Sequence, residues 1–400
     1  MTDLFWPGDQ RAGDLMSDAA FLAAMVAVED AWLAVLVDAG VAPAAARADL
    51  TAKVSAADTA VIAAGAEADG NPVIPLLSLL RDRAGGQTVR WLHRGLTSQD
   101  VIDTALMLCL RDSLSRVGSE IGMQTRILIR LVEAHHCAPM LAHTLTQPAL
   151  PSTVGVKLAN WLSGLLDAAD TLAALPAPRV QAGGAAGTLA APTELAGSPE
   201  DAIALSDALA ATLGLAAASP WHTTRSIITR WGDALVTCCD AWGHIASDVT
   251  IGTRTEIGEL TEGGGGRSST MPHKINPVLS VLIRRAALAA PPLAATLHAA
   301  SAASVDERAD GGWHAEWATL RTLTRRTVVA AAQTSELLAG LVIDTERAAA
   351  NLAAVGDLLA EQRLMTELTG RPARFGYTGA TDLLVDAVLQ RARHYLKEAT

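Results

Sequence analysis

Aromatic residues and cysteine are scarce in this sequence. Only 4% of its 400 residues are Phe, Trp or Tyr, although half are apolar, chiefly Ala and Leu. Ala and Leu favour helices, whereas strands favour aromatic and β-branched residues, so the composition predicts an all-α fold. The four cysteines (Cys109, Cys137, Cys238 and Cys239) show no CxxC spacing. This argues against a disulfide scaffold or a zinc site, and we expect reduced, buried thiols.

Positive charge is also scarce. The net charge is −11, and basic residues cluster only in short pairs such as Arg284-Arg285 and Arg325-Arg326, which excludes an extended nucleic-acid-binding patch. Residues 1–10 lack the basic-then-apolar design of a signal peptide. The most apolar long stretch, Ala286 to Ala303, contains Pro291-Pro292 and predicts a poor membrane span. We therefore expect a cytoplasmic protein without a membrane or nucleic-acid partner.

The apolar spacing predicts helices through most of the chain. An N-terminal domain, 1–95, is expected to hold helices over 14–40, with a cap at Ser17-Asp18, 43–64 and 73–84. A central bundle, 96–341, is expected to hold long helices over 98–117, 122–136, 152–175, 198–213, 223–251, 276–303 and 314–341. Pro291-Pro292 should kink or break one of them. A small C-terminal domain, 342–400, has candidate caps at Asp344 and Thr378. The long helices are apolar around most of their surface, which is typical of a bundle that packs against other subunits.

Three polar, glycine-bearing stretches interrupt this helical background: 93–103, 143–157 and 263–276. Packed helices need no such residues, and we expect the three stretches to converge on a site.

The third stretch has the strongest pattern, with four glycines, Gly263 to Gly266, before a polar run. Asn276 and Pro277 fit the N-cap and first position of a helix, whose N-terminus favours an anion. A P-loop is excluded because GxxxxGK[ST] is missing. A plain glycine-rich linker remains the alternative from composition alone.

The run Ser268-Ser269-Thr270-Met271-Pro272-His273-Lys274-Ile275-Asn276 resembles the signature of the fumarase/aspartase superfamily, except that Arg267 stands where a glycine is usual. The resemblance implies a mobile lid in which Ser268 is the proton-abstracting base, while Lys274 and Asn276 bind a substrate carboxylate. It also implies that Arg267, Ser269 and Met271 lie against the substrate. Closure around a serine beside a lysine and backbone donors can stabilise an alkoxide.

The other two stretches resemble two further regions of this superfamily. In the first, the resemblance implies that Thr97 and Ser98 bind carboxylate oxygens near His93, although Thr97-Ser98 alone reads as a helix cap. In the second it implies that His143 and Gln147 lie at the substrate, and a structural histidine is the alternative for His143. Many lyases of the superfamily carry a catalytic histidine where this chain has Leu145, and its paired glutamate where it has Val281.

These two departures favour the lactonising branch, the 3-carboxy-cis,cis-muconate cycloisomerases, over a fumarase-type mechanism. Segments 181–188, 219–225 and 307–317 resemble the same branch. Arg225 is then a candidate for binding a carboxylate, and His222 and His314 are candidate proton carriers beside Ser268. The nearby tryptophans read equally as core residues.

The resemblance implies an all-α, three-domain enzyme that needs no metal or other cofactor. Its expected reaction lactonises 3-carboxy-cis,cis-muconate, a tricarboxylate formed during protocatechuate degradation. It further implies a homotetramer whose active sites take loops from three subunits. Two alternatives remain: a C–N or C–O lyase that releases fumarate or a relative, and a non-catalytic scaffold.

Overall fold

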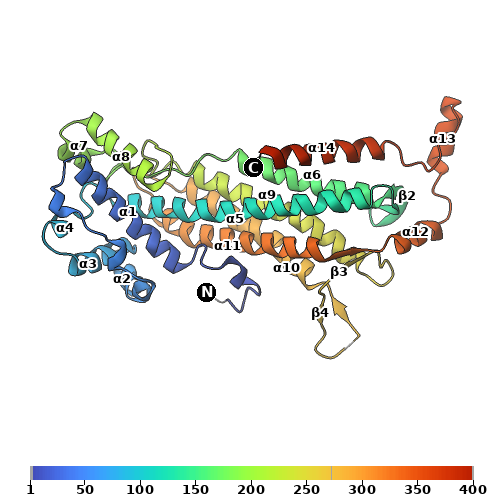
Figure 1. Ribbon diagram of the computed structural model, residues 1–400, viewed down its shortest axis with the longest axis horizontal. Coiled ribbons are helices and arrows are strands. Elements are labelled where there is room, and N and C mark those ends of the chain that lie inside the picture. Colours follow the sequence, from blue (N-terminus) through green and yellow to red (C-terminus); the bar gives the residue numbers. More distant parts are fainter. Residues whose placement is uncertain (1–2, 272, 399–400) are drawn as a thin grey trace. The chain divides into compact units, whose positions relative to one another are not determined.

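The computed structural model describes residues 3–271 and 273–398 (Figure 1). Its α-helices are α1 (Asp18–Asp38), α2 (Thr59–Asp69), α3 (Val73–Arg83), α4 (Gly86–Trp91), α5 (Ser98–Ala134), α6 (Val154–Ala173), α7 (Ala190–Ala196), α8 (Pro199–Leu213), α9 (Ser226–Gly252), α10 (Val278–Ala302), α11 (Gly311–Gly340), α12 (Thr345–Ala354), α13 (Ala360–Thr369) and α14 (Thr381–Glu398). Short 3-10 helices are η1 (Asp9–Ala12), η2 (Ala44–Ala46), η3 (Thr51–Lys53) and η4 (Ala56–Asp58). The predicted all-α class is confirmed.

Strands form only small ribbons in the described part of the chain. β1 (Pro139–Thr144) pairs with β2 (Gln147–Thr153), β3 (Leu260–Glu262) with β6 (Leu341–Ile343), and β4 (Gly266–Arg267) with β5 (Ile275–Asn276). All three pairs are antiparallel. Two of these ribbons, β1–β2 and β4–β5, carry stretches that the sequence singled out as polar.

One boundary prediction for a long helix was wrong, and one predicted break is absent. The helix α5 runs unbroken over 37 residues where two helices were expected. Gly118 and Gly122 lie inside it. Each directly follows a fully buried residue, Val117 or Ile121, so packing outweighs the low helix propensity of glycine. The helix α10 also continues through Pro291-Pro292, so the predicted break is absent.

The expected helix over 43–64 was wrong as well. This stretch forms η2, η3 and η4, and α2 begins only at Thr59. Ser55 and Asp58 form a capping box at the start of η4, which leads directly into α2. The caps at Ser17 and Asp344 are confirmed, because their side chains accept the backbone N–H groups of Ala20 and Arg347. Thr378 is not a cap, since α14 begins at Thr381.

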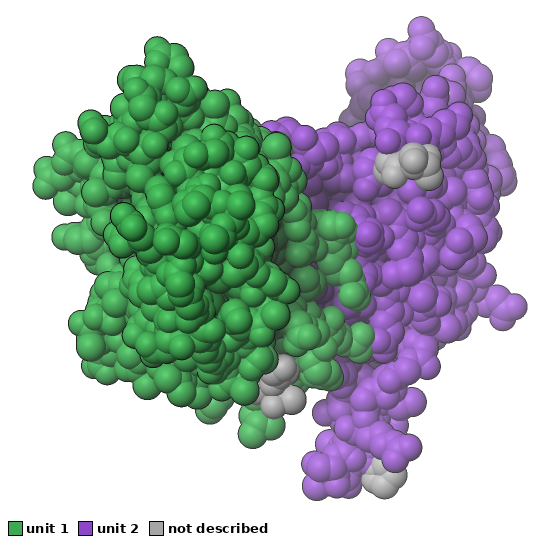
Figure 2. Space-filling view, turned by 60° about the vertical axis from the view of Figure 1, so that its left-hand side comes forward, with its two compact units in different colours: residues 1–116, 175–233, 292–326 green, residues 117–174, 234–291, 327–400 purple. Residues whose placement is uncertain are grey.

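The chain divides into two compact units (Figure 2). Unit 1 comprises residues 1–116, 175–233 and 292–326, and unit 2 comprises 117–174, 234–291 and 327–400. The helices α5, α9, α10 and α11 contribute residues to both. The predicted three-domain division, 1–95, 96–341 and 342–400, stays a prediction.

Each unit contains a buried tryptophan whose indole N–H group is hydrogen-bonded. In unit 1, Trp32 of α1 donates to the carbonyl of Arg94 at 2.7 Å. In unit 2, Trp242 of α9 donates to Gln124 Oε1 at 2.8 Å, and the Gln124 amide donates in turn to the carbonyl of Ala331. Pairing the polar tip of a buried indole removes the main cost of burying it. The first bond ties α1 to the segment before α5, and the other two tie α9, α5 and α11 together within unit 2.

Two helices, α1 and α10, are long and apolar enough to cross a membrane by length and composition alone. The apolar window of α1 is 56% buried, and a core helix of a soluble protein passes the same test. The window of α10 is only 28% buried. Contrary to our expectation, α10 meets these length and composition criteria for a membrane span in spite of Pro291 and Pro292. One or two such helices are weak evidence for a membrane protein.

Candidate active site

The signature loop forms a β-hairpin in unit 2. Gly266 pairs with Asn276 and Arg267 with Ile275, so residues 268–274 make up its tip. A Cβ on Gly263 would lie 2.5 Å from the carbonyl oxygen of Gly340, and one on Gly266 would lie 2.1 Å from a methyl carbon of Val278. These glycines are therefore required by close packing at the base of the hairpin, and not only for flexibility.

Ser268 is placed so that backbone donors face its hydroxyl oxygen. Its Oγ accepts the N–H of Met271 at 3.0 Å and that of Thr270 at 3.4 Å. Two N–H dipoles that point at one oxygen stabilise negative charge on it. This arrangement is what a serine needs in order to act as a base.

The cations of the hairpin tip are available to a ligand. Arg267 and Lys274 are exposed, and neither side chain forms an ion pair with any residue that the structure describes. Ser269 and Met271 are exposed beside them, while Asn276 is half-buried in β5. The sequence-predicted residues of this loop are thus brought together on one hairpin, and their roles toward a substrate stay predictions.

The N-terminus of α10 is capped by Glu262 and not, as predicted, by Asn276. The buried Glu262 carboxylate accepts the N–H of Ser280 at 2.6 Å and that of Leu279 at 3.1 Å. Asn276 is instead part of β5, and α10 begins at Val278. The anion that this helix end favours is therefore a residue of the protein, just before the glycine run.

Three segments that the sequence analysis noted separately, 93–103, 181–188 and 219–225, meet around Asp100 in unit 1. Asp100, in the first turn of α5, is fully buried and accepts the backbone N–H groups of Thr97, Gly183 and Gly184 at 2.9, 3.0 and 2.9 Å. The bond from Thr97 is half of a capping box, which agrees with the reading of Thr97-Ser98 as a helix start. Thr97 and Ser98 are half-buried at this helix end.

His222 is the second partner of Asp100. Its Nε2 lies 2.9 Å from Asp100 Oδ1, and its side chain is almost fully buried. A Cβ on Gly183 would lie 2.7 Å from His222 Cε1, so the glycines of segment 181–188 make room for this ring. A carboxylate that holds an imidazole in one orientation is a common arrangement for proton transfer.

Arg225 was predicted to bind a substrate carboxylate, and the structure contradicts this. The guanidinium is 1% exposed, and it donates to both oxygens of Asp103 (2.7 and 3.1 Å) and to both oxygens of Glu316, with a shortest distance of 2.6 Å. Burial by itself lowers the pKa of this group, but Asp103 and Glu316 outweigh burial and raise the pKa above its ordinary value. Every donor edge of Arg225 faces protein, so it organises the core.

The two tryptophans near this cluster are core residues, as the alternative interpretation held. Trp313 and Trp221 are both buried, and their indole N–H groups donate to Asp103 Oδ1 (3.0 Å) and to the carbonyl of Val180 (2.9 Å). The Arg225 guanidinium also lies 4.8 Å from the ring centroid of Trp221. Such contacts stabilise the buried charge.

Two other predicted histidines are occupied by the protein. His93 Nδ1 lies 2.6 Å from the buried Glu29. His314 is exposed, and its nitrogens face the carbonyls of Gly70 (2.9 Å) and Asp310 (3.2 Å). Neither ring nitrogen of His314 is directed at open space, which weakens it as a proton carrier.

The β1–β2 hairpin of unit 2 carries the second predicted region. His143 and Gln147 are exposed on it, and its turn consists of Leu145 and Thr146, both with positive φ (48° and 70°). Neither residue type favours this conformation, so the turn is strained. His143 also lines a polar cavity of about 630 Å³ together with Lys157, which pairs with Asp248 at 3.4 Å.

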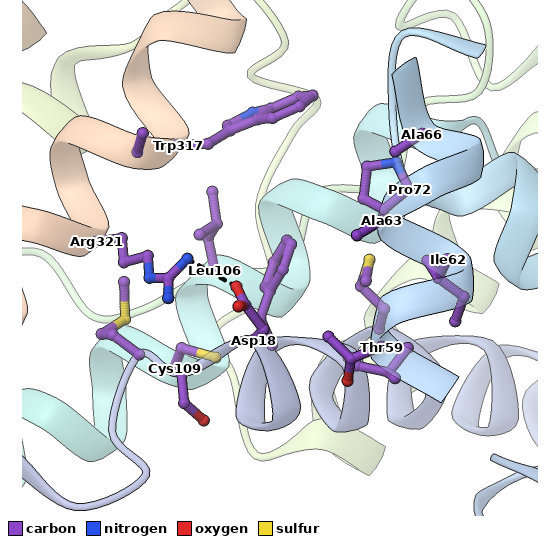
Figure 3. A pocket seen from close by; sticks show the side chains of 16 residues that line it. Asp18, Thr59, Ile62, Ala63, Ala66, Pro72, Leu106, Cys109, Trp317 and Arg321 are labelled. Atoms are coloured by element: carbon purple, nitrogen blue, oxygen red, sulfur yellow. Dashed lines mark hydrogen bonds and ion pairs between the residues drawn. The ribbon is translucent and has the colours of Figure 1, made fainter. Parts of the chain in front are cut away.

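A second cavity, of about 370 Å³, lies in unit 1 between α1, α2, α5 and α11 (Figure 3). Its lining is mostly apolar, with an ion pair between Asp18 and Arg321 at 2.7 Å. It contains none of the predicted site residues. The chemistry of the chain therefore points to the polar hairpins and the Asp100 cluster.

The predicted convergence of the three polar stretches stays a prediction, because 93–103 belongs to unit 1 and the other two belong to unit 2. Four buried acids that organise the site regions were missed as site residues: Asp100, Asp103, Glu262 and Glu316. The Thr97-x-x-Asp100 spacing was a signal for one of them. The single group of three metal-binding side chains among the described residues includes no predicted site residue, and the metal-free mechanism stays a prediction.

The chain matches known proteins over most of its length. A lyase family model matches residues 15–290. A nitrosuccinate lyase from Streptomyces davaonensis is 41% identical over 366 residues, which cover 88% of this chain and 77% of that protein. A 3-carboxy-cis,cis-muconate cycloisomerase from Pseudomonas aeruginosa is 36% identical over 396 residues, which cover 96% and 84%.

A solved structure extends the likeness to the fold. The crystal structure of 3-carboxy-cis,cis-muconate lactonizing enzyme from Pseudomonas putida has a TM-score of 0.86 and 29% identity, and the match covers 96% of this chain and 97% of that one. The signature run, the helical fold and these matches agree, and the chain is an enzyme of the lyase family in the fumarase/aspartase superfamily.

Proposed function

We propose that the chain catalyses an addition to, or an elimination across, a carbon–carbon bond beside a carboxylate, and that its substrate is 3-carboxy-cis,cis-muconate. The observation that carries the proposal is the Ser268 hydroxyl with two backbone N–H groups at its oxygen, on the same hairpin as Arg267 and Lys274, which form no ion pair with any described residue. The cycloisomerases and the solved lactonizing enzyme to which the chain is similar support this choice of substrate.

In lactonisation, a carboxylate oxygen of the substrate forms a C–O bond to one carbon of a double bond, and the neighbouring carbon gains a proton. The product is an isomer of the substrate, so no second reactant is consumed. The reverse step removes that proton and breaks the C–O bond, which is a β-elimination. Charge develops on the carboxylate beside the carbon that exchanges its proton, and fixed donors at that oxygen lower the barrier.

The proposed roles follow from where each residue lies. Ser268 exchanges the proton, and Lys274, Arg267 and Asn276 hold carboxylates on the hairpin. Thr97 and Ser98 are proposed to bind a carboxylate at the N-terminus of α5. The pair of His222 and Asp100 is the second candidate for proton transfer, because the carboxylate orients the ring. Arg225 takes no part in binding.

A second candidate substrate is nitrosuccinate, and the 41% identity to a nitrosuccinate lyase favours it. Here a proton leaves one carbon, the C–N bond of the neighbouring carbon breaks, and nitrite departs from an unsaturated four-carbon dicarboxylate. A nitro group is planar with two oxygens, like a carboxylate. Both substrates therefore present three such groups to the same cations, and the same serine would act as the base.

The test compares both substrates on one preparation of the full chain. Loss of the diene absorbance of 3-carboxy-cis,cis-muconate reports lactonisation, and free nitrite reports elimination from nitrosuccinate; each assay is run with and without EDTA. We expect Ser268→Ala to lose about 10²–10⁴-fold in kcat/KM. Thr270→Ala, an exposed neighbour whose backbone N–H is retained, is the matched control and should stay within about tenfold.

Each outcome decides between specific alternatives. Diene loss without nitrite release supports the cycloisomerase, and nitrite release alone replaces it by the C–N lyase. Activity that Ser268→Ala leaves intact would refute the role of the hairpin serine. Inactivity toward both substrates would refute both proposed reactions and favour another lyase reaction or the non-catalytic scaffold.

We also propose that the chain acts as a homotetramer in which several subunits build each site. The support within this chain is α10, which is apolar yet largely exposed, and the exposed hairpin, whose cations Arg267 and Lys274 form no ion pair with any residue in 3–271 or 273–398. Light scattering coupled to size-exclusion chromatography measures the assembly directly. A monomer that turns over substrate would refute shared sites.

A further inference from the structure

Three potential metal ligands lie together in unit 2, apart from the residues of the candidate active site. His136, Cys137 and Asp382 each offer one ligand atom, and these atoms all lie within 4.8 Å of one another. His136 Nδ1 is 3.6 Å from Cys137 Sγ. Cys137 and Asp382 are exposed, and His136 is half-buried. The cluster joins residues that are nearly 250 positions apart in the sequence, so spacing along the chain does not reveal it.

The His136-Cys137 segment is held in place from one side. It connects the end of α5 to β1, and the carbonyl of Ala138 accepts the N–H of Val154 at 2.9 Å. Gly155, at the start of α6, packs so closely that a Cβ there would lie 2.4 Å from the carbonyl oxygen of His136. The segment therefore cannot shift toward α6 without a clash.

Asp382 is held in place from the other side, in the first turn of α14. Arg391 of this helix donates to Asp167 and Asp170 of α6, both at 2.7 Å, and Arg393 donates to Glu133 of α5 at 2.6 Å. Val385 and Leu389 are buried on the same helix. The helix is thus docked along its length, and its first turn meets the His136-Cys137 segment.

The donor set and its spacing fit zinc. Zn²⁺ binds imidazole nitrogen at about 2.0–2.1 Å and thiolate sulfur at about 2.3 Å in a tetrahedron, which places the two ligand atoms about 3.6 Å apart. The observed separation of His136 Nδ1 from Cys137 Sγ matches this. A carboxylate oxygen is the third common zinc ligand, and water completes such sites.

A second observation concerns the imidazole of His136. Its Nε2 is buried and has no hydrogen-bond partner among the described residues. A buried polar atom without a partner is unfavourable, so the described part of the protein does not satisfy this ring. Because no hydrogen bond at Nε2 fixes the proton of the ring on one nitrogen, Nδ1, which faces Cys137 Sγ, can take the deprotonated form that binds an ion.

We propose that His136, Cys137 and Asp382 bind a zinc ion, or another divalent ion of similar preference, that ties α14 to the connection between α5 and β1. The site is structural and does not depend on the proposed reaction. Binding releases the proton of the Cys137 thiol, and the ion holds the resulting thiolate. The alternative is that the three side chains meet only through hydrogen bonds and bind no ion.

The test uses the full chain after dialysis against a chelator. Cobalt(II) serves as the probe, because a cobalt–thiolate bond gives a charge-transfer absorption that only a cysteine ligand produces. Zinc should displace the cobalt at one equivalent and should raise the melting temperature. Zinc should also slow alkylation of Cys137 at least about tenfold. This last readout needs no variant, so it survives if a variant fails to fold.

Matched variants separate the proposed ligands from their neighbours. Cys137→Ser should abolish the cobalt–thiolate absorption, and Asp382→Asn and His136→Ala should weaken binding at least about tenfold. Asp386→Asn, one turn along α14, and His135→Ala, next to His136, should bind like the unchanged chain. The proposal fails if the unchanged chain binds no cobalt. It also fails if Cys137→Ser binds equally tightly, or if the control variants lose as much as the ligand variants.

Discussion

Removal of the Arg225 guanidinium should destabilise unit 1 strongly. The buried cluster holds one positive group between the carboxylates of Asp103 and Glu316, so its net charge with both ionised is −1. In Arg225→Met two buried carboxylates face each other without a cation, and Trp313 alone cannot offset them. Removing one partner of a buried ion pair costs about 3–5 kcal/mol, and we expect a loss of that size in the free energy of unfolding.

A change at Glu316 should lower the free energy of unfolding less than the loss of Arg225. Glu316→Gln removes the excess negative charge and keeps an oxygen that accepts a hydrogen bond from Arg225. We expect it to cost about 1 kcal/mol. In the double variant Arg225→Met, Glu316→Gln, one uncompensated carboxylate remains instead of two, so the loss should be smaller than the sum of the single losses.

Urea unfolding followed by circular dichroism measures these differences, and steady-state kinetics on the accepted substrate give KM for each folded variant. Arg363→Met is the control, because it breaks an exposed pair with Asp357 and should change stability little. The reasoning is refuted if Arg225→Met unfolds within about 1 kcal/mol of the unchanged chain while KM rises tenfold or more. That result would return Arg225 to the substrate-binding role that the sequence first suggested.

Four further predictions test other parts of the structure. Gly183→Ala should displace His222, because the new Cβ would meet its ring; we expect a lower melting temperature and weaker turnover. Thr146→Gly should stabilise the β1–β2 hairpin by about 1 kcal/mol in urea unfolding, because glycine adopts positive φ without strain. Glu262→Gln should lower kcat/KM about tenfold, the equivalent of 1–2 kcal/mol for a lost cap, whereas Glu256→Gln should not. At neutral pH a thiol reagent should label Cys137 alone in the folded chain; the pKa of the buried Cys109 and Cys239 thiols is raised to about 12 by burial, and labelling of either thiol would contradict it.

The helical class and most helix positions could be predicted because they depend on local composition and apolar spacing. The misplaced boundaries have a different cause. Gly118 and Gly122 suggested a break in α5, but tertiary packing determined the helix there. The stretch 43–64 has helical composition, yet it folds into short turns whose ends are fixed by local capping at Ser55 and Asp58.

The hairpin residues of the candidate site could be predicted because their chemistry is concentrated in one continuous run. The role of Arg225 could not, since a cation beside tryptophans reads the same whether it faces a substrate or a carboxylate. Its partners Asp103 and Glu316 are more than 90 positions away along the chain. Pairing between residues far apart in the chain produces no periodic pattern in the sequence. The cap that Glu262 provides for α10 is another example.

The cap that Glu262 provides for α10 has a consequence for how this enzyme can diversify. One carboxylate holds the start of the glycine run to the start of α10, so the β4–β5 hairpin is a loop closed at a single base. We expect that residues beyond this base, such as Arg267 of β4 and Ile275 of β5, can be exchanged without transmitting strain to the long helices. We therefore expect that single replacements in the β4–β5 hairpin can change the substrate while the free energy of unfolding of the helical framework changes little.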